Sequence, residues 1–446
     1  MTIGIIMQRT ALLFPSCFLL LPAVTASSAQ APPPSPELAL VQRARHRMAE
    51  NIERLPNYTC LETIERSVRL PDKKKLLFRD RIHLDVAFIG TNEMFAWPGS
   101  DHFAADLLQQ LPRQAGAAVA IGGFGGWVGS LFGRSAPAFT YDGACLVENR
   151  RGSRYIFSVP LLSSGYQIMV GERSATSAYA GSICIDADES DVMMLEVHAE
   201  EIAVPVAAAS ETIRYGRTRV GSGDFLLPRD DELTMTDLHG NENHNLTRFS
   251  ACRQYTSQSS ISFDTVHEGA PVQQEKAAEI ELPAGISLDL ELETPITYEA
   301  SAIGDPIAAR LTRPIHAAGV SIPKGATVSG RIRGLEEYYE PEKYFSVSLE
   351  FSSLAFGGQR ARFSARLIGP RLEPQAGEPP GHAPPSSGSG RWSGNSGAAA
   401  PPHAAAAAGF DIDASAPRFG VFRVNGGSLR LNRGLRMIWQ TQGGIE

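Results

Sequence analysis

The sequence predicts a mainly β (α+β) fold: an antiparallel sheet with an amphipathic helix over one face, followed by a second all-β domain. Three observations support this prediction: long stretches in which apolar and polar residues alternate, one early segment with helical spacing, and two segments of biased composition that interrupt the alternation. The chain has 446 residues. At about 150 residues per domain, this length allows two or three domains, each able to bury its own core.

The charge balance argues against a nucleic-acid partner. The formal net charge is -7 at pH 7, from 41 Lys and Arg residues against 48 Asp and Glu residues. Binding to a phosphate backbone requires clustered positive charge, which this composition does not supply. The 42 Gly and 30 Pro residues indicate many turns or an unstructured segment. We therefore expect no nucleic acid among the partners.

The first 29 residues have the pattern of a secretory signal peptide. Arg9 precedes an apolar run over residues 11–24, and small residues follow up to a cleavage site after Ala29. The run is shorter than the roughly 20 residues that span a bilayer. Cys17 lies inside this run, whereas a lipoprotein cysteine lies at its end. We therefore expect a periplasmic or secreted protein without a transmembrane helix after cleavage.

Four cysteines remain in the mature chain: Cys60, Cys145, Cys184 and Cys252. An even number in an exported protein favours two disulfides, each worth about 2 to 4 kcal/mol, and three pairings exist. Cys60 and Cys252 lie near the two ends of the first domain, and the other two cysteines lie on strand-like segments between them. This order favours the nested pairing of 60 with 252 and 145 with 184. The alternative is that the thiols are free and buried.

After a Pro-rich lead-in over residues 30–35, a helix is predicted from Pro36 to Leu55. Ser35 is a good N-cap residue, and Pro36 stands at the favoured first helical position. Pro56 ends the helix. Apolar residues recur at spacings of three and four and form one stripe: Val41, Ala44, Met48, Ile52 and Leu55.

From Asn57 onward the period changes from that of a helix to that of strands. Ile82, Leu84, Val86 and Phe88 alternate with more polar residues, as in a strand with one buried face. Short turn-forming segments separate the strand candidates, which predicts an antiparallel meander within a domain over residues 36–263. The other candidates are 58–68, 139–149, 154–160, 164–172, 179–186, 192–202, 211–220, 224–236 and 245–263.

A glycine-rich apolar segment over residues 115–132 interrupts the strands. It contains no charged residue and six glycines, too many for a membrane span. One interpretation is a loop that is flexible or partly buried. The other is a mobile apolar lid or a lipid-touching segment that presents Phe124, Trp127 and Phe132 to a ligand or to the membrane surface.

Residues 264–279 are polar and are interpreted as a linker to a second domain over 280–370 and 410–446. Leu288, Leu290 and Leu292 alternate with acidic residues, and Phe345, Val347, Leu349 and Phe351 alternate with polar ones, both typical of half-buried strands. Between these two parts, residues 371–409 consist largely of Pro, Gly, Ser and Ala. With so few large apolar side chains, this insert is expected to be disordered.

The first domain carries a pattern that resembles a known superfamily. The predicted helix continues into LPNYTCLETIERSV (55–68), and GSICIDADESDVMMLEVHAEE (181–201) follows later. Together these segments resemble the lipoprotein-carrier superfamily of LolA and RseB. The resemblance implies a curved antiparallel sheet covered by helices on its concave face. It also implies a hollow that holds acyl chains or envelope peptides.

The second domain resembles another family. LPAGISLDLELETPI, GDPIAARLTRPI and GVSIPKGATVSGRI occur in this order over residues 282–332. They are similar to the C-terminal β-barrel of TrbI-type conjugation and type IV secretion proteins, a likeness that extends over 282–367 and 418–441. The resemblance implies a second β-barrel or sandwich domain that docks on another envelope protein.

No motif of a known catalytic or metal centre occurs in the chain: G-x-S-x-G, HExxH, a P-loop and CxxC are all absent. Three local groups contain suitable residue types, and each is better explained as a cap or a turn. They are Ser100 with Asp101 and His102, Asp186 with Asp188 and Asp191, and His239 with Glu242 and His244. We therefore expect no catalytic residue, cofactor or metal.

An acidic and aromatic group around Tyr338 and Tyr339 has two interpretations, a solvated loop or a protein-docking rim. Taken together, the sequence favours a non-enzymatic envelope protein that binds an apolar ligand, a lipid or a lipidated protein, with the second domain as a docking barrel. One alternative is a structural subunit or accessory of an envelope or secretion assembly. Another is a hydrolase whose site has no familiar motif.

Overall fold

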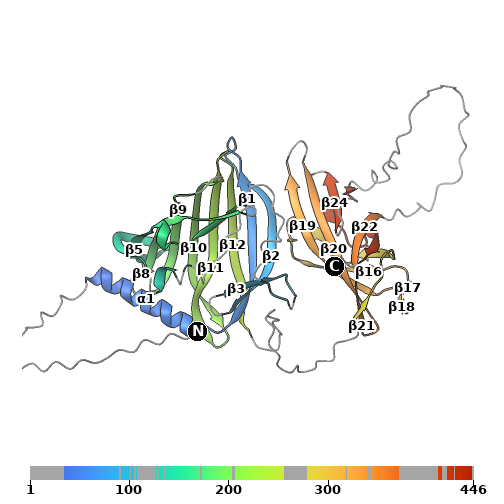
Figure 1. Ribbon diagram of the computed structural model, residues 1–446, viewed down its shortest axis with the longest axis horizontal. Coiled ribbons are helices and arrows are strands. Elements are labelled where there is room, and N and C mark those ends of the chain that lie inside the picture. The colour runs from blue at the N-terminus through green and yellow to red at the C-terminus, as the bar shows by residue number, and fades with distance from the viewer. Residues whose placement is uncertain are drawn as a thin grey trace, which may run out of the picture.

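The fold is described from a computed structural model, in which two β-sheets lie side by side (Figure 1). The structure describes residues 35–89, 92–100, 102–104, 107, 127, 130–133, 136–170, 173–202, 206–255, 279–317, 319–339, 343–370, 410–413, 419–425 and 427–443. The predicted signal peptide, nearly all of the predicted linker and the whole of the 371–409 insert lie outside these residues.

The first domain is built on a ten-stranded antiparallel sheet with the strand order β3-β2-β1-β12-β11-β10-β9-β8-β5-β4. Sequence neighbours are mostly sheet neighbours, so the predicted meander is confirmed. The small β6–β7 hairpin stands apart from this sheet. The strands of this domain are β1 (Tyr58–Arg69), β2 (Leu77–Ile89), β3 (Asn92–Ala96), β4 (Thr140–Val147), β5 (Arg150–Val159), β6 (Gln167–Val170), β7 (Arg173–Thr176), β8 (Ala178–Asp186), β9 (Val192–Glu200), β10 (Val206–Val220), β11 (Gly223–Asp237) and β12 (Glu242–Gln254).

The predicted helix is confirmed as α1 (Pro36–Arg54), which Ser35 caps by accepting a hydrogen bond from the backbone N–H of Leu38 at 3.3 Å. Its apolar stripe packs on the sheet, with Val41, Ala44 and Met48 buried. The expectation of a sheet covered by helices is wrong. The helices that the structure describes as complete elements are α1 and the three-residue 3-10 helix η2 (Leu161–Ser163), and Trp127 and residues 130–132 are also helical. Helix α1 lies at the β8 to β11 side of the sheet, away from β1 and β2 (Figure 1).

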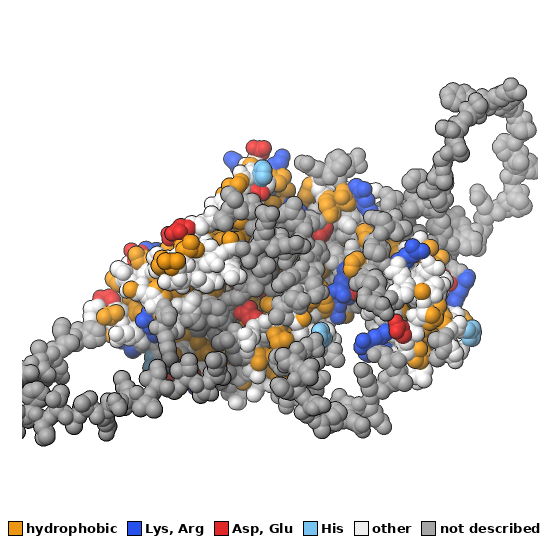
Figure 2. Space-filling model, in the orientation of Figure 1, with side chains coloured by type: hydrophobic (Ala, Val, Ile, Leu, Met, Phe, Trp, Pro, Cys, Tyr) orange, Lys and Arg blue, Asp and Glu red, His pale blue; other side chains and the backbone are white. Residues whose placement is uncertain are grey.

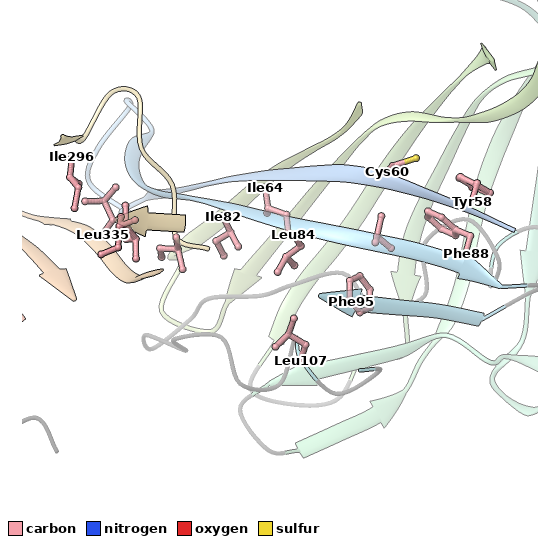
Figure 3. Packing of buried hydrophobic residues seen from close by; sticks show 14 of the residues in the cluster. Tyr58, Cys60, Ile64, Ile82, Leu84, Phe88, Phe95, Leu107, Ile296 and Leu335 are labelled. Carbon is pink, nitrogen blue, oxygen red and sulfur yellow. The ribbon is translucent and has the colours of Figure 1, made fainter. Parts of the chain in front are cut away.

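The side of the first sheet on which α1 packs is called the covered face. The alternation predicted for β2 is confirmed, because Ile82, Leu84, Val86 and Phe88 are all buried on this face. Figure 3 shows buried side chains along β1 and β2, from Tyr58 and Phe88 at one end to Ile82 at the other, where Ile296 and Leu335 of the second domain follow. The core therefore extends from one domain into the other.

The second domain is a curled half-barrel whose main path has the strand order β13-β21-β20-β19-β16-β14-β26-β22. The predicted inward residues Leu288, Leu290 and Leu292 are buried, and Trp439 packs edge-on against Phe351 at 5.1 Å. The strands are β13 (Glu279–Glu281), β14 (Ser287–Leu292), β15 (Ile296–Thr297), β16 (Pro306–Leu311), β17 (Ile315–Ala317), β18 (Val320–Ile322), β19 (Thr327–Tyr338), β20 (Tyr344–Phe356), β21 (Gln359–Arg362), β22 (Ser364–Pro370), β23 (Phe410–Asp413), β24 (Gly420–Asn425), β25 (Arg430–Leu431) and β26 (Arg436–Gln442).

Backbone hydrogen bonds join the two domains. The N–H of His83 on β2 donates to the carbonyl of Ile303 at 2.8 Å, and the N–H of Ile303 donates to the carbonyl of Arg81 at 2.8 Å. Gly304 has φ +99°, and a Cβ there would lie 2.3 Å from the carbonyl oxygen of His83. Only glycine fits this close approach, so the junction is a specific, tightly packed contact.

Two disulfides join Cys60 to Cys252 and Cys145 to Cys184, which is the nested arrangement. Disulfides persist in oxidising compartments, so the chain belongs outside the cytoplasm. Among the described helices, none has the length and apolar character required to cross a bilayer. On the described surface that is in view in Figure 2, charged side chains of both signs are scattered among apolar ones.

Candidate functional site

The strand register places an acidic residue in the middle of an apolar row on the covered face. Asp231 on β11 lies beside Ile213 on β10 and Thr247 on β12. The remaining partners in this row are apolar or aromatic. The complete row, from β5 to β2, is Tyr155, Ile183, Leu195, Ile213, Asp231, Thr247, Ile64 and Ile82.

Two further carboxyl groups lie on the same face near Asp231. Glu211 on β10 hydrogen-bonds Asp231 through its side chain, and Glu62 on β1 acts electrostatically on Asp231. Glu93 on β3 acts in the same way on Glu62 and Glu211. We call Glu62, Glu211 and Asp231 the carboxyl cluster. Its residues come from three strands, and the fold brings together positions separated by up to 169 residues of sequence, from 62 to 231.

A small pocket opens over this cluster. Its volume is about 20 Å³, room for one water molecule. Glu62 and Asp231 are only 8% and 7% exposed, whereas the rim residues Glu93 and Phe249 are half-buried. The pocket therefore leads from a partly exposed rim to buried carboxyl groups. The remaining lining residues are Ile64, Val86, Phe88, Phe95, Leu233, Asn245 and Thr247.

Two oxygen atoms of the cluster have no hydrogen-bond partner within the part of the chain that the structure describes. They are Oε2 of Glu62 and Oδ1 of Asp231, both fully enclosed. Burying a polar atom without a partner costs about 1 to 3 kcal/mol, and more when the group is charged. Such a cost is unusual in a native core and is most often met at sites that bind something.

Trp127 covers the cluster from above. Its indole Nε1–H donates to Oε1 of Glu211 at 3.2 Å. The ring packs against Tyr166 and Tyr179 at centroid distances of 5.1 and 5.3 Å. Leu131, a few residues further along the chain, is completely buried. The protein's own side chains therefore occupy the described part of the covered face, and a guest larger than water has to displace some of them.

Burial raises the pKa of every carboxyl group in the cluster. Desolvation, with the Glu93 charge as a smaller cause, raises the pKa of Glu62 to about 8. Desolvation also raises the pKa of Glu211 to about 7, against the opposing hydrogen bond from Trp127. The pKa of Asp231 is raised well above its ordinary value by desolvation and by the neighbouring Glu211. No Lys, Arg or His is among the causes of these three shifts.

The structure describes two of the three predicted lid residues. Phe124 lies outside the described residues. Trp127 is buried against the sheet, as described above. Phe132 is partly buried and stacks on Phe139 at a centroid distance of 6.4 Å. In this structure, neither Trp127 nor Phe132 projects as an exposed lipid-touching residue.

The predicted docking residues lie at the domain junction. The Tyr338 hydroxyl donates to Oε2 of Glu336 at 2.6 Å, and the Tyr338 ring stacks on Tyr344 at 4.6 Å. The Tyr339 hydroxyl donates to the backbone carbonyl of Phe78 in the first domain at 3.1 Å. Tyr339 thus contacts the chain's own first domain while its side chain stays partly exposed, and residues 340–342 of the predicted segment lie outside the described residues.

Asp188 and His239 lie in turns, Asp101 lies outside the described residues, and Glu242 and His244 lie on β12 rather than in a turn. Oδ1 of Asp186 accepts the N–H groups of Asp188 and Glu189, and Oδ1 of Asp237 accepts that of His239. His244 lies on β12, where its Nε2 is 2.9 Å from Oε1 of Glu232. Among the residues that the structure describes, no three or more His, Cys, Asp or Glu side chains are placed so that they could hold a metal ion.

The sequence reasoning missed the carboxyl cluster, although a signal for it was present. Glu62 falls in the inward register of Cys60 and Ile64, and Asp231 falls in that of Leu233. A charged residue at an inward position of a strand is exceptional and marks a position for closer attention.

A larger groove of about 550 Å³ lies over β4, β5, β8 and β9. Most of its walls come from outward-facing residues of these strands, such as Arg154, Ser182 and His198. Its polar groups include paired ones: Arg154 binds Asp142 at 2.9 Å, and Ser182 donates to Glu196 at 2.9 Å. The unsatisfied buried carboxyl groups make the cluster the stronger candidate.

Comparison with known proteins identifies no relative: no family model matches the chain, and no curated protein matches it.

Proposed function

We propose that this chain is a non-enzymatic binding protein of the cell envelope, periplasmic or secreted, that holds an apolar ligand or a lipidated partner on the covered face of its first sheet. The observation that carries the proposal is the set of unsatisfied, buried carboxyl oxygens beneath a wall of aromatic and aliphatic side chains. A closed apolar core gains nothing from such groups, whereas a binding site requires a few polar groups at fixed positions among apolar ones.

The covered face carries apolar rows against which the body of a guest would pack once it displaces some of the covering side chains. Helix α1 covers this face at the β8 to β11 side. Trp127 and its aromatic neighbours Tyr166 and Tyr179 cover the cluster, and a hydrogen bond holds the indole of Trp127 to Glu211. Displacing Trp127 would open the face to a chain-like ligand.

The second domain serves as a docking barrel in this proposal. Its attachment through the paired backbone bonds at Ile303 fixes it beside β2, so a partner bound to the half-barrel would lie next to the ligand site. This arrangement suits a protein that receives or delivers a guest at one place in the envelope.

Solvent extraction and mass spectrometry of the purified full-length chain test the proposal. The expected result is a co-purifying apolar molecule, together with a change in tryptophan fluorescence when a lipid extract is added. Trp127→Phe is the control that assigns this fluorescence change to Trp127. Finding no bound lipid and no fluorescence response would contradict the proposal. Isolation in a large detergent-resistant complex without lipid would support the structural-subunit alternative.

The convergence of three carboxyl groups favours one second candidate, a hydrolase that works by general acid–base catalysis. Carboxyl groups with raised pKa values, such as Glu62 at about 8 and Glu211 at about 7, are suited to proton transfer near neutral pH. Hydrolysis of chromogenic ester or glycoside substrates by the wild type, abolished in Glu211→Gln, would favour this candidate. Equal background rates for both proteins would exclude it for those substrates.

A further inference from the structure

We infer that the carboxyl cluster recognises a protonated amine carried on an apolar body, so that the ligand is an amphipathic cation. This inference rests on the proposed binding function and adds the charge and head group of the ligand. Two observations support it independently: the unpartnered oxygens of Glu62 and Asp231, and the absence of a cation beside the cluster among the described residues.

The charge of the site is the first argument. Glu62 and Asp231 line the pocket from the floor and Glu93 lines it at the rim. Elsewhere in the domain, carboxyl groups on the same strands are neutralised by arginines, as Glu65 on β1 is by Arg81 at 2.7 Å. The cluster is different because no described Lys, Arg or His acts on its three carboxyl groups, so the charge that each acquires on ionisation is left for a group from outside. An anionic or neutral lipid head would leave the two oxygens without a matching charge.

The walls of the pocket are the second argument. Phe88, Phe95 and Phe249 surround the carboxyl groups. The faces of aromatic rings attract cations, and the apolar parts of the same rings pack against hydrocarbon. An ammonium group on an alkyl chain meets both requirements. The head faces carboxyl oxygens and aromatic rings, and the chain packs against the apolar parts of the same rings.

The size of the pocket is the third argument. Its volume of about 20 Å³ accepts a group as small as a water molecule, and a primary ammonium is of that size. It does not accept a phosphate or a choline head without rearrangement. The half-buried rim at Glu93 and Phe249 gives the attached chain a way out of the pocket.

Calorimetric titration of the full-length protein with three ten-carbon probes tests the inference at pH 8. We expect decylamine to bind at least ten times more tightly than decanol and decanoate. Butylamine separates an amine on a lipid-like body from a small soluble amine, and we expect it to bind at least ten times more weakly than decylamine. Butylamine binding as tightly as decylamine would overturn the requirement for an apolar body.

Charge-removing variants locate the binding site. Glu62→Gln and Asp231→Asn, made singly so that at least one folded protein is obtained, should each reduce the preference for decylamine over decanol by at least fivefold. The matched control is Glu232→Gln, on the strand that carries Asp231 but on its opposite face, where Glu232 binds His244. This control should keep the full preference. If both cluster variants also keep it, the carboxyl groups are structural and the inference fails.

The inference and the proposed function fail in different ways. Equal binding of decylamine, decanol and decanoate to the covered face overturns the amine head group and leaves the binding function intact. No binding of any ten-carbon probe, with no co-purifying lipid, overturns the binding function itself.

Discussion

Replacing Glu62 by Gln should change how the stability of this protein depends on pH. In the folded protein the pKa of Glu62 is about 8, against an ordinary value of 4.5. Between these two values the folded protein keeps a proton that the unfolded chain releases, so raising the pH lowers the free energy of unfolding. One pKa unit corresponds to about 1.4 kcal/mol. From pH 5 to pH 8, Glu62 alone should therefore cost the wild type about 3 to 4 kcal/mol.

A glutamine at this position carries no titrating proton, so the variant should lose that part of the pH dependence. The measurement is guanidinium unfolding of both proteins at pH 5, 6, 7 and 8, comparing the change in unfolding free energy with pH. Subtracting one curve from the other cancels the titration of groups distant from the cluster. The groups that face Glu62 are Glu93 on β3 and Asp231 on β11, and their titration shifts with the substitution.

Parallel curves for wild type and variant would refute the reasoning, because Glu62 would then titrate at an ordinary pKa. A second variant, Glu211→Gln, guards against misfolding of the first one. It should remove the contribution of Glu211 to the pH dependence of the unfolding free energy. That contribution is complete near pH 7, where the pKa of Glu211 lies.

Three further predictions follow from named contacts. Trp127→Phe removes the donor to Glu211 and should raise the pKa of that carboxyl, measured by carbon NMR titration; an unchanged or lower pKa would contradict the hydrogen bond. Replacing Cys60 and Cys252 by Ser removes a disulfide between residues 192 apart in sequence. In the chain-entropy picture this should lower the free energy of unfolding by about 5 kcal/mol, measured by urea unfolding under non-reducing conditions. A loss below about 1 kcal/mol would show that the disulfide constrains the unfolded chain little. Gly304→Ala should destabilise the domain junction by about 1 to 3 kcal/mol and split the calorimetric unfolding peak into two, whereas an unchanged single peak would contradict the close approach.

Local periodicity was enough to predict most of the secondary structure of the first domain, whereas in the second domain it marked only β14, β20 and β26. The stripe through Val41, Ala44 and Met48 predicted α1, because a 3.6-residue period places those side chains on one face. Alternation from Ile82 to Phe88 predicted β2 and its buried face. The short strands β3 and β7 were missed, since segments of five and four residues carry too few alternations to be recognised.

The candidate site could not be predicted in the same way, because it depends on register between strands far apart in sequence. Glu211 and Asp231 become neighbours through the β10–β11 pairing, and Glu62 joins them through β1 and β12. Periodicity assigns each side chain to a face but does not determine which residues meet across that face. The junction at Ile303 was missed for the same reason, since nothing local marks a loop that pairs with a strand of another domain.

The most direct test of the account is an NMR titration that follows the indole N–H signals of the full-length protein as decylamine is added. The Trp127 indole donates to Glu211 over the cluster, whereas Trp439 lies buried in the second domain and serves as the internal reference. We expect a saturable shift of the Trp127 signal, while the Trp439 signal stays in place. Binding that leaves the Trp127 signal unmoved would show that the ligand site lies elsewhere and would contradict the account.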